Sequence, residues 1–138
     1  KLNLLVDSRL GPLKFNFDFF QKGSQMNPFY KGQIRASQFN IGKLLNQPDL
    51  GTTDALLFAQ GKGLQFDQLN TKLYGQFSSF LFRENKLDTI SVDIDLNRNR
   101  ALGLVNISDA DVNLSIQGQF EANDSIQKFS AIAEVNQL

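Results

Sequence analysis

Apolar and polar side chains alternate along much of this chain, which is the pattern of β-strands that have one apolar and one polar face. Between residues 13 and 19, Phe15, Phe17 and Phe19 alternate with Asn16 and Asp18. Comparable alternation covers residues 69–81, 90–96, 112–120 and 129–135. Weaker strand patterns cover residues 2–9, 30–37, 56–66 and 101–107. The chain is therefore expected to be all-β, with about nine strands.

Short clusters of turn-forming residues separate most of these segments. Successive strands that are joined by short connections pair in antiparallel fashion, which predicts a meander of hairpins. One apolar and one polar face on each strand is typical of an antiparallel sheet with one side in water. We therefore expect a single β-rich domain over residues 1–138, built on a curved antiparallel sheet.

One segment between Ser37 and Pro48 follows helical spacing instead. Ile41, Leu44 and Leu45 fall at positions i, i+3 and i+4, which places them on one face of a helix. Ser37 can cap the start of this helix, and Pro48 ends it. We expect one short helix here, plugging one end of the sheet.

Composition and charge exclude several functions. Lys+Arg and Asp+Glu both number 14, so the chain lacks the excess positive charge with which proteins bind nucleic acid. No apolar run approaches the ~20 residues of a membrane-spanning helix. The 13 Phe residues supply apolar surface that needs no hydrogen-bond partner. Strand patterns run towards both ends of a chain that starts at Lys1, which favours a fragment of a longer repetitive protein.

Residues for catalysis and metal binding are scarce. The chain has no His and no Cys, which excludes Ser-His-Asp triads, His metal sites and thiol chemistry. The carboxylate pairs Asp93/Asp95 and Asp109/Asp111 could serve a glycosidase-like enzyme, and the second pair could belong to a calcium loop. Both pairs fit solvated positions on strands and turns better. We therefore expect a protein that is not an enzyme and has no metal or cofactor.

The face formed by Phe15, Phe17 and Phe19 allows two interpretations that periodicity does not separate. In a closed β-sandwich it would be core covered by a second sheet, and the domain would have a structural or adhesive role. In an open sheet it would be an accessible apolar wall that contacts lipid. The alternation leaves both interpretations open.

Five short motifs follow one another along the chain: Phe39-Asn40-Ile41-Gly42-Lys43-Leu44-Leu45, Asp49-Leu50-Gly51, Gly61-Lys62-Gly63, Ile107-Ser108-Asp109-Ala110-Asp111-Val112-Asn113-Leu114 with Gly118, and the closing residues 129–138. In this order and spacing they resemble the repetitive β-rich region of TamB-like members of the AsmA family, in the versions found in Bacteroidetes-type bacteria. The resemblance covers nearly the whole chain. One motif departs from it: a Tyr-x-Tyr strand followed by Gly in the family corresponds here to Phe80-Leu81-Phe82, and no such glycine follows.

The resemblance implies a long periplasmic protein anchored in the inner membrane, with its sheet curled into an open groove (a β-taco). Phospholipid acyl chains would pass along the groove towards the outer membrane. In some relatives the implied role is outer-membrane protein assembly with a barrel protein as partner. Neighbouring β segments of the same parent chain would continue the sheet. The candidates for lining the groove are Phe15, Phe17, Phe19, Leu73, Phe77, Leu81, Ile90, Val92, Ile94, Leu114, Ile116 and Phe120.

Overall fold

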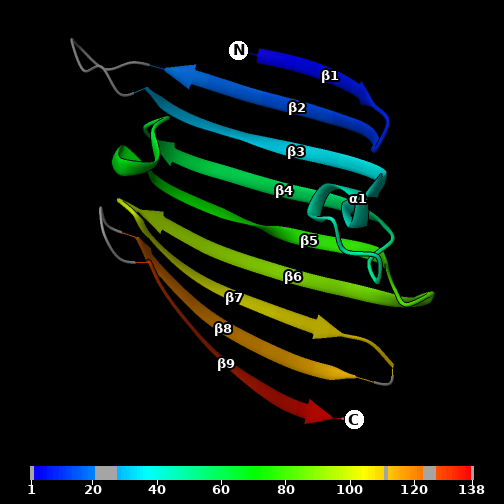
Figure 1. Ribbon diagram of the computed structural model, residues 1–138. Coiled ribbons are helices and arrows are strands. Elements are labelled where there is room, and N and C mark those ends of the chain that lie inside the picture. The colour runs from blue at the N-terminus through cyan, green and yellow to red at the C-terminus, as the bar shows by residue number, and fades with distance from the viewer. Residues whose placement is uncertain (1, 21–27, 111, 123–126, 138) are drawn as a thin grey trace.

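The computed structural model describes residues 2–20, 28–110, 112–122 and 127–137, which form one sheet of nine strands (Figure 1). The strands are β1 (Leu2–Ser8), β2 (Gly11–Phe20), β3 (Phe29–Asn40), β4 (Thr52–Lys62), β5 (Asn70–Phe82), β6 (Asn85–Asn97), β7 (Arg100–Ser108), β8 (Asn113–Ala122) and β9 (Gln127–Gln137). A helix, α1 (Ile41–Leu45), follows β3, and a 3-10 turn, η1 (Phe66–Gln68), follows β4.

Every strand pairs antiparallel with its neighbours in the sequence, in the order β1 to β9. The predicted all-β meander with one short helix is thus confirmed. The sheet is open, because β1 and β9 lie at opposite edges and do not pair. No second sheet covers it within the described residues, since the strands pack against their sequence neighbours. A closed β-sandwich is therefore not the fold of this part of the chain.

The register of the sheet places apolar positions of successive strands directly opposite one another. Phe17 lies opposite Gly32, which in turn lies opposite Ala59 on β4. Ala59 lies opposite Leu73, and Leu73 opposite Ile94. Directly opposed residues project from the same face of an antiparallel sheet. One face of the sheet therefore carries apolar residues from successive strands.

The helix α1 is shorter than predicted, and its cap is different. Its side-chain cap comes from Asn40, whose Oδ1 accepts a hydrogen bond from the Lys43 backbone N–H at 3.0 Å. Ser37 does not cap the helix, because β3 continues to Asn40 through a bulge at Gln38. The helix stops at Asn46, which adopts the left-handed conformation before Pro48.

The predicted apolar face of the helix was wrong at two of its three positions. Ile41 packs against the buried residues of the sheet, but Leu44 and Leu45 are 56% and 54% exposed. The buried position is Gly42, where a Cβ would overlap the Leu50 carbonyl oxygen. A helix of five residues contacts the sheet only through its first turn. It does cover one end of the sheet, over β4 (Figure 1).

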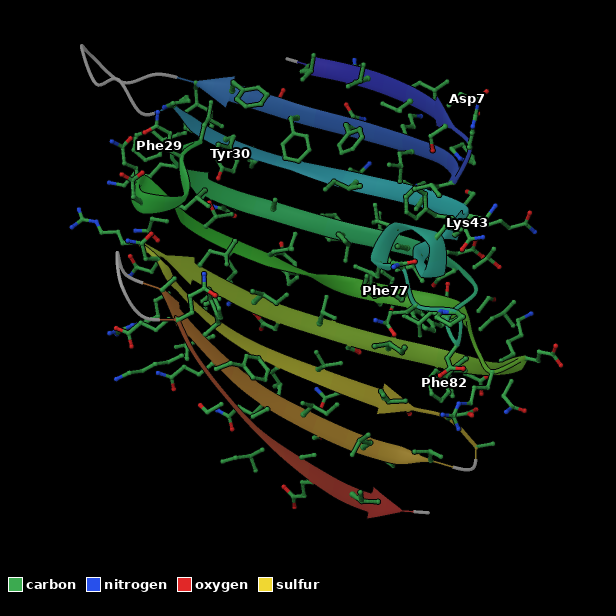
Figure 2. The ribbon with its side chains drawn as sticks, viewed as in Figure 1. Asp7, Phe29, Tyr30, Lys43, Phe77 and Phe82 are labelled. Carbon is green, nitrogen blue, oxygen red and sulfur yellow. The ribbon has the colours of Figure 1, made fainter. Side chains whose placement is uncertain are left out.

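The small buried core lies beneath this helix. Ala36, Phe39 and Ala55 form it, and Leu10, Leu13, Ile41 and Phe77 pack around it. In Figure 2 the label of Phe77 lies just below α1, while Tyr30 lies near the opposite end of the sheet. At that end β4 stops at Lys62, four residues before the predicted end of the strand, because Gly63 takes a φ of +88°. Asp67 and Gln68 then lie in η1.

Candidate functional site

Four rows of directly opposed residues make up a surface that we call the apolar face. The row through Phe17 continues with Gly32, Ala59, Leu73, Ile94, Gly103, Gly118 and Ala131. The other rows run through Phe15, Ile34, Leu57, Gly75, Val92, Val105, Ile116 and Ala133; through Leu13, Ala36, Ala55, Phe77, Ile90, Ile107, Leu114 and Val135; and through Phe19, Tyr30, Gly61, Thr71, Leu96, Ala101, Phe120 and Phe129. Thr71 is the one polar residue in these rows.

Eleven of the twelve groove-lining candidates fall in these rows, so the register brings them together on one face. Leu81 is the exception. It pairs with Lys86 beyond Ser79, whose φ of +51° changes the course of β5. Its side chain lies against Gly51, in the segment that follows α1. Leu81 therefore belongs to the covered end of the sheet and not to the rows.

The apolar face contains residues that the sequence reasoning missed. Ile34, Leu57, Val105 and Ile107 occupy the same rows as the candidates. Their segments show weaker alternation. Strands were therefore predicted there, but the pattern did not indicate on which face of the sheet each side chain lies. Pairing each weak strand with its stronger neighbour in the meander would have identified them.

An apolar hollow lies at the β1 end of this face. It has a volume of about 320 Å³ and is lined by Leu2, Leu4, Phe15, Phe17, Phe19, Tyr30, Ile34 and Leu64. The ring centroids of Phe17 and Phe19 are 6.1 Å apart, as are those of Phe19 and Tyr30. The Tyr30 hydroxyl donates to the Gly63 carbonyl at 3.1 Å and is also hydrogen-bonded to the Thr71 hydroxyl. The hydroxyl oxygen, which is the one polar side-chain atom of Tyr30, therefore has its hydrogen-bond partners within the protein.

The opposite face is polar but not uniformly so. Lys72 and Asp93 form an ion pair at 3.9 Å, and Arg100 and Glu121 form one at 3.4 Å. A hollow of about 880 Å³ opens largely on this side, and its lining combines Lys72 and Arg100 with aromatic residues. Two aromatic pairs stack on this face of the sheet, with ring centroids 5.8 Å apart for Phe20 and Phe29 and 5.5 Å apart for Phe58 and Tyr74.

Of the carboxylates singled out from the sequence, Asp93 and Asp95 both line a hollow of about 480 Å³, which also contacts Leu102, Leu104 and Ile132. Asp93 is half exposed and pairs with Lys72, and the Asp109 carboxylate accepts a hydrogen bond from the Ala110 N–H at 2.8 Å. Asp111 lies outside the described residues. Within those residues, no group of three or more His, Cys, Asp or Glu side chains could hold a metal ion.

One carboxylate pair was not anticipated. Asp88, near the start of β6, meets Asp109, which follows the end of β7, next to the opposed pair of Thr89 and Ser108. The hydrogen bond from Asp109 and its like charge raise the pKa of Asp88 above the ordinary value of 3.8. Asp88 is fully exposed. We therefore interpret Asp88 and Asp109 as two surface carboxylates that repel each other, and not as an acid–base site.

No helix in the described part of the chain is long and apolar enough to cross a membrane. The most extensive surface feature among the described residues is the apolar face. Comparison of the chain with protein-family models, with curated proteins and with solved structures gives no match.

Proposed function

We propose that this domain is a non-enzymatic module of a lipid-transfer bridge, in which the apolar face contacts phospholipid acyl chains. The observation that carries the proposal is the continuity of that face across eight strands, β2 to β9, of a single-layer sheet. An ordinary soluble domain buries such a face against a second layer. Here, within the described residues, α1 covers one end and the rest has no second layer.

The dimensions of the face suit hydrocarbon chains. Four rows of side chains, spaced two residues apart along each strand, span roughly 20 Å. Each methylene that moves from water onto such a surface contributes up to about 0.8 kcal/mol. A wall of Phe, Leu, Ile and Val offers no polar group that could select a head group. Binding would therefore depend on contact area, which favours bulk transfer of lipids over selection of one lipid.

The resemblance to TamB-like members of the AsmA family adds the cellular setting of this proposal. It supports a periplasmic location, a parent protein anchored in the inner membrane, and transport between the inner and outer membranes. It also supports neighbouring β segments of the parent chain and an outer-membrane barrel protein as partners.

The proposal can be tested with two variants that add the same charge to adjacent residues of β2. Phe17→Asp places a carboxylate on the apolar face, whereas Asn16→Asp places one on the polar face. Both proteins are expressed in a Gram-negative host, and co-purified phospholipid is quantified by mass spectrometry. Phe17→Asp should lose most of the lipid bound by the wild type, and Asn16→Asp should retain it.

Circular dichroism of the same variants separates loss of lipid from loss of folding. Because no second layer covers Phe17, the Asp side chain can reach water and Phe17→Asp should remain folded. If the wild type carries no phospholipid, or if both variants carry as much as the wild type, the proposal is wrong.

A further inference from the structure

The hollow on the polar side of the sheet has a lining of a different kind from the apolar face. It has a volume of about 880 Å³ and reaches from the end of β2 to the start of β7. Among the described residues, neither edge strand contributes to its lining, so strands added beyond β1 or β9 would not fill it by pairing. Its volume lies in the range of pockets that bind small molecules.

Aromatic rings line this hollow at two places. Phe20 is 52% exposed and stacks on Phe29 with an angle of 8° between the ring planes. Tyr74 is 40% exposed and stacks on Phe58 with an angle of 22°. In Figure 2 the label of Phe29 lies at the end of the sheet away from α1. Each exposed ring is held by a second ring, which makes it a flat apolar platform for a ligand.

Polar side chains form the floor of the hollow between these two platforms. They occupy two rows of directly opposed positions, which are Lys62, Asn70 and Asn97 in one row and Gln60, Lys72 and Asp95 in the other. The rows lie two residues apart along each strand, which is about 7 Å. All six side chains are exposed. The three amides supply both donors and acceptors of hydrogen bonds, so the floor suits a ligand that carries both.

The charges in and around the hollow are balanced. Two of the three cations in its lining already contact a carboxylate, since Lys72 lies 3.9 Å from Asp93 and Arg100 lies 3.4 Å from Glu121. Asp95 adds a further carboxylate to the lining. A polyanion would meet these carboxylates as well as the cations, and like charges across an interface oppose binding. The hollow therefore favours a neutral polar ligand.

We propose that this hollow binds a neutral oligosaccharide. A sugar ring has an apolar face of C–H groups, which stacks on an aromatic ring, and hydroxyl groups that each donate and accept hydrogen bonds. Phe29 and Tyr74 lie two strands and four positions apart, or roughly 16 Å. That distance exceeds the length of one sugar ring, so the ligand is a chain of sugars that reaches both platforms. This inference concerns the face opposite the apolar face and does not depend on lipid binding.

Calorimetric titration of the full chain tests this proposal. The probes are three neutral hexasaccharides: β-1,4-linked glucose, α-1,4-linked glucose and β-1,4-linked N-acetylglucosamine. We expect saturable binding of at least one of them. Tyr74→Ala should raise its dissociation constant about tenfold or more, because the sugar loses a platform, whereas Tyr74→Phe keeps the ring and should bind like the wild type. Phe82→Ala is the matched control, since Phe82 is also 40% exposed but lies outside the hollow (Figure 2).

Circular dichroism of the variants checks that each is folded, and salt dependence separates a neutral ligand from an anion. Binding of the neutral hexasaccharide should not change when NaCl is raised from roughly 0.1 to 1 M, because there is no ligand charge to screen. The proposal is overturned if none of the three probes binds, or if folded Tyr74→Ala binds as tightly as the wild type. It is also overturned if a heparin hexasaccharide binds more tightly than all three and is released by salt.

Discussion

Two glycines of the apolar face, Gly32 and Gly103, should respond in opposite ways to the same substitution. They lie in one cross-strand row, on β3 and β7. A Cβ at Gly32 would overlap the Asn16 carbonyl oxygen and approach the Phe17 ring to 2.5 Å. A Cβ at Gly103 would find its nearest atom, Ile94 Cγ1, at 3.7 Å, which is ordinary contact.

The expected magnitudes follow from these distances. Replacing a glycine inside a strand by alanine gains about 0.5–1 kcal/mol, because the unfolded chain loses freedom. Gly103→Ala should show that gain. Gly32→Ala must also displace the β2 backbone and the Phe17 ring, and overpacking of this kind costs about 1–3 kcal/mol. The net loss should be about 1–2 kcal/mol. The two variants should then differ by about 2 kcal/mol, or roughly 6–8 °C in Tm for a chain of this length.

Thermal unfolding followed by circular dichroism measures this difference directly. Gly118→Ala is a second control in the same row, since the nearest atom to its Cβ would be the Ser130 carbonyl oxygen at 3.9 Å. It should behave like Gly103→Ala. If Gly32→Ala is as stable as these controls, the Phe17 ring does not lie over Gly32, and the described packing of the apolar face is wrong at this point.

Three further substitutions probe polar contacts. Tyr30→Phe should lower the free energy of unfolding in urea by about 1–2 kcal/mol, because the buried Gly63 carbonyl loses its donor; no loss would contradict that bond. Asp93→Asn should change stability by less than ~0.5 kcal/mol, since its ion pair is exposed; a several-fold larger loss would show that this carboxylate is buried or binds a metal. Asp109→Asn should stabilise the protein at neutral pH by removing its repulsion with Asp88. That advantage should shrink as pH falls through the raised pKa of Asp88 and disappear below its ordinary value of 3.8; an advantage that grows on acidification would refute this reasoning.

Alternation was sufficient to predict the strands and the meander, because the side-chain period of a strand is two and short connections force antiparallel neighbours. It could not predict whether the sheet closes. Phe15 and Phe17 would alternate with polar residues in the same way in a sandwich core and on an open sheet. Closure depends on pairing between strands far apart in the sequence, which no local pattern encodes.

Local departures from the regular strand were also beyond the sequence pattern. Gln38 and Ser79 adopt positive φ without being glycine, asparagine or aspartate, so neither residue type signals a bulge or a bend. The first moves the helix cap from Ser37 to Asn40, and the second separates Leu81 from the rows of the apolar face. The Asp88–Asp109 pair arises from strand register, which brings together residues that are distant in the chain.

Site-specific photo-crosslinking in living cells tests the central claim most directly. A photoreactive residue is placed in turn at Phe17, Leu73 and Ile94 on the apolar face, and at Asn16 and Asp93 on the opposite face. Crosslinked phospholipid is detected on the purified protein after irradiation. We predict phospholipid adducts at the three apolar-face positions and none at the two opposite positions. Equal crosslinking on both faces, or none on either, would contradict the claim that the apolar face binds lipid.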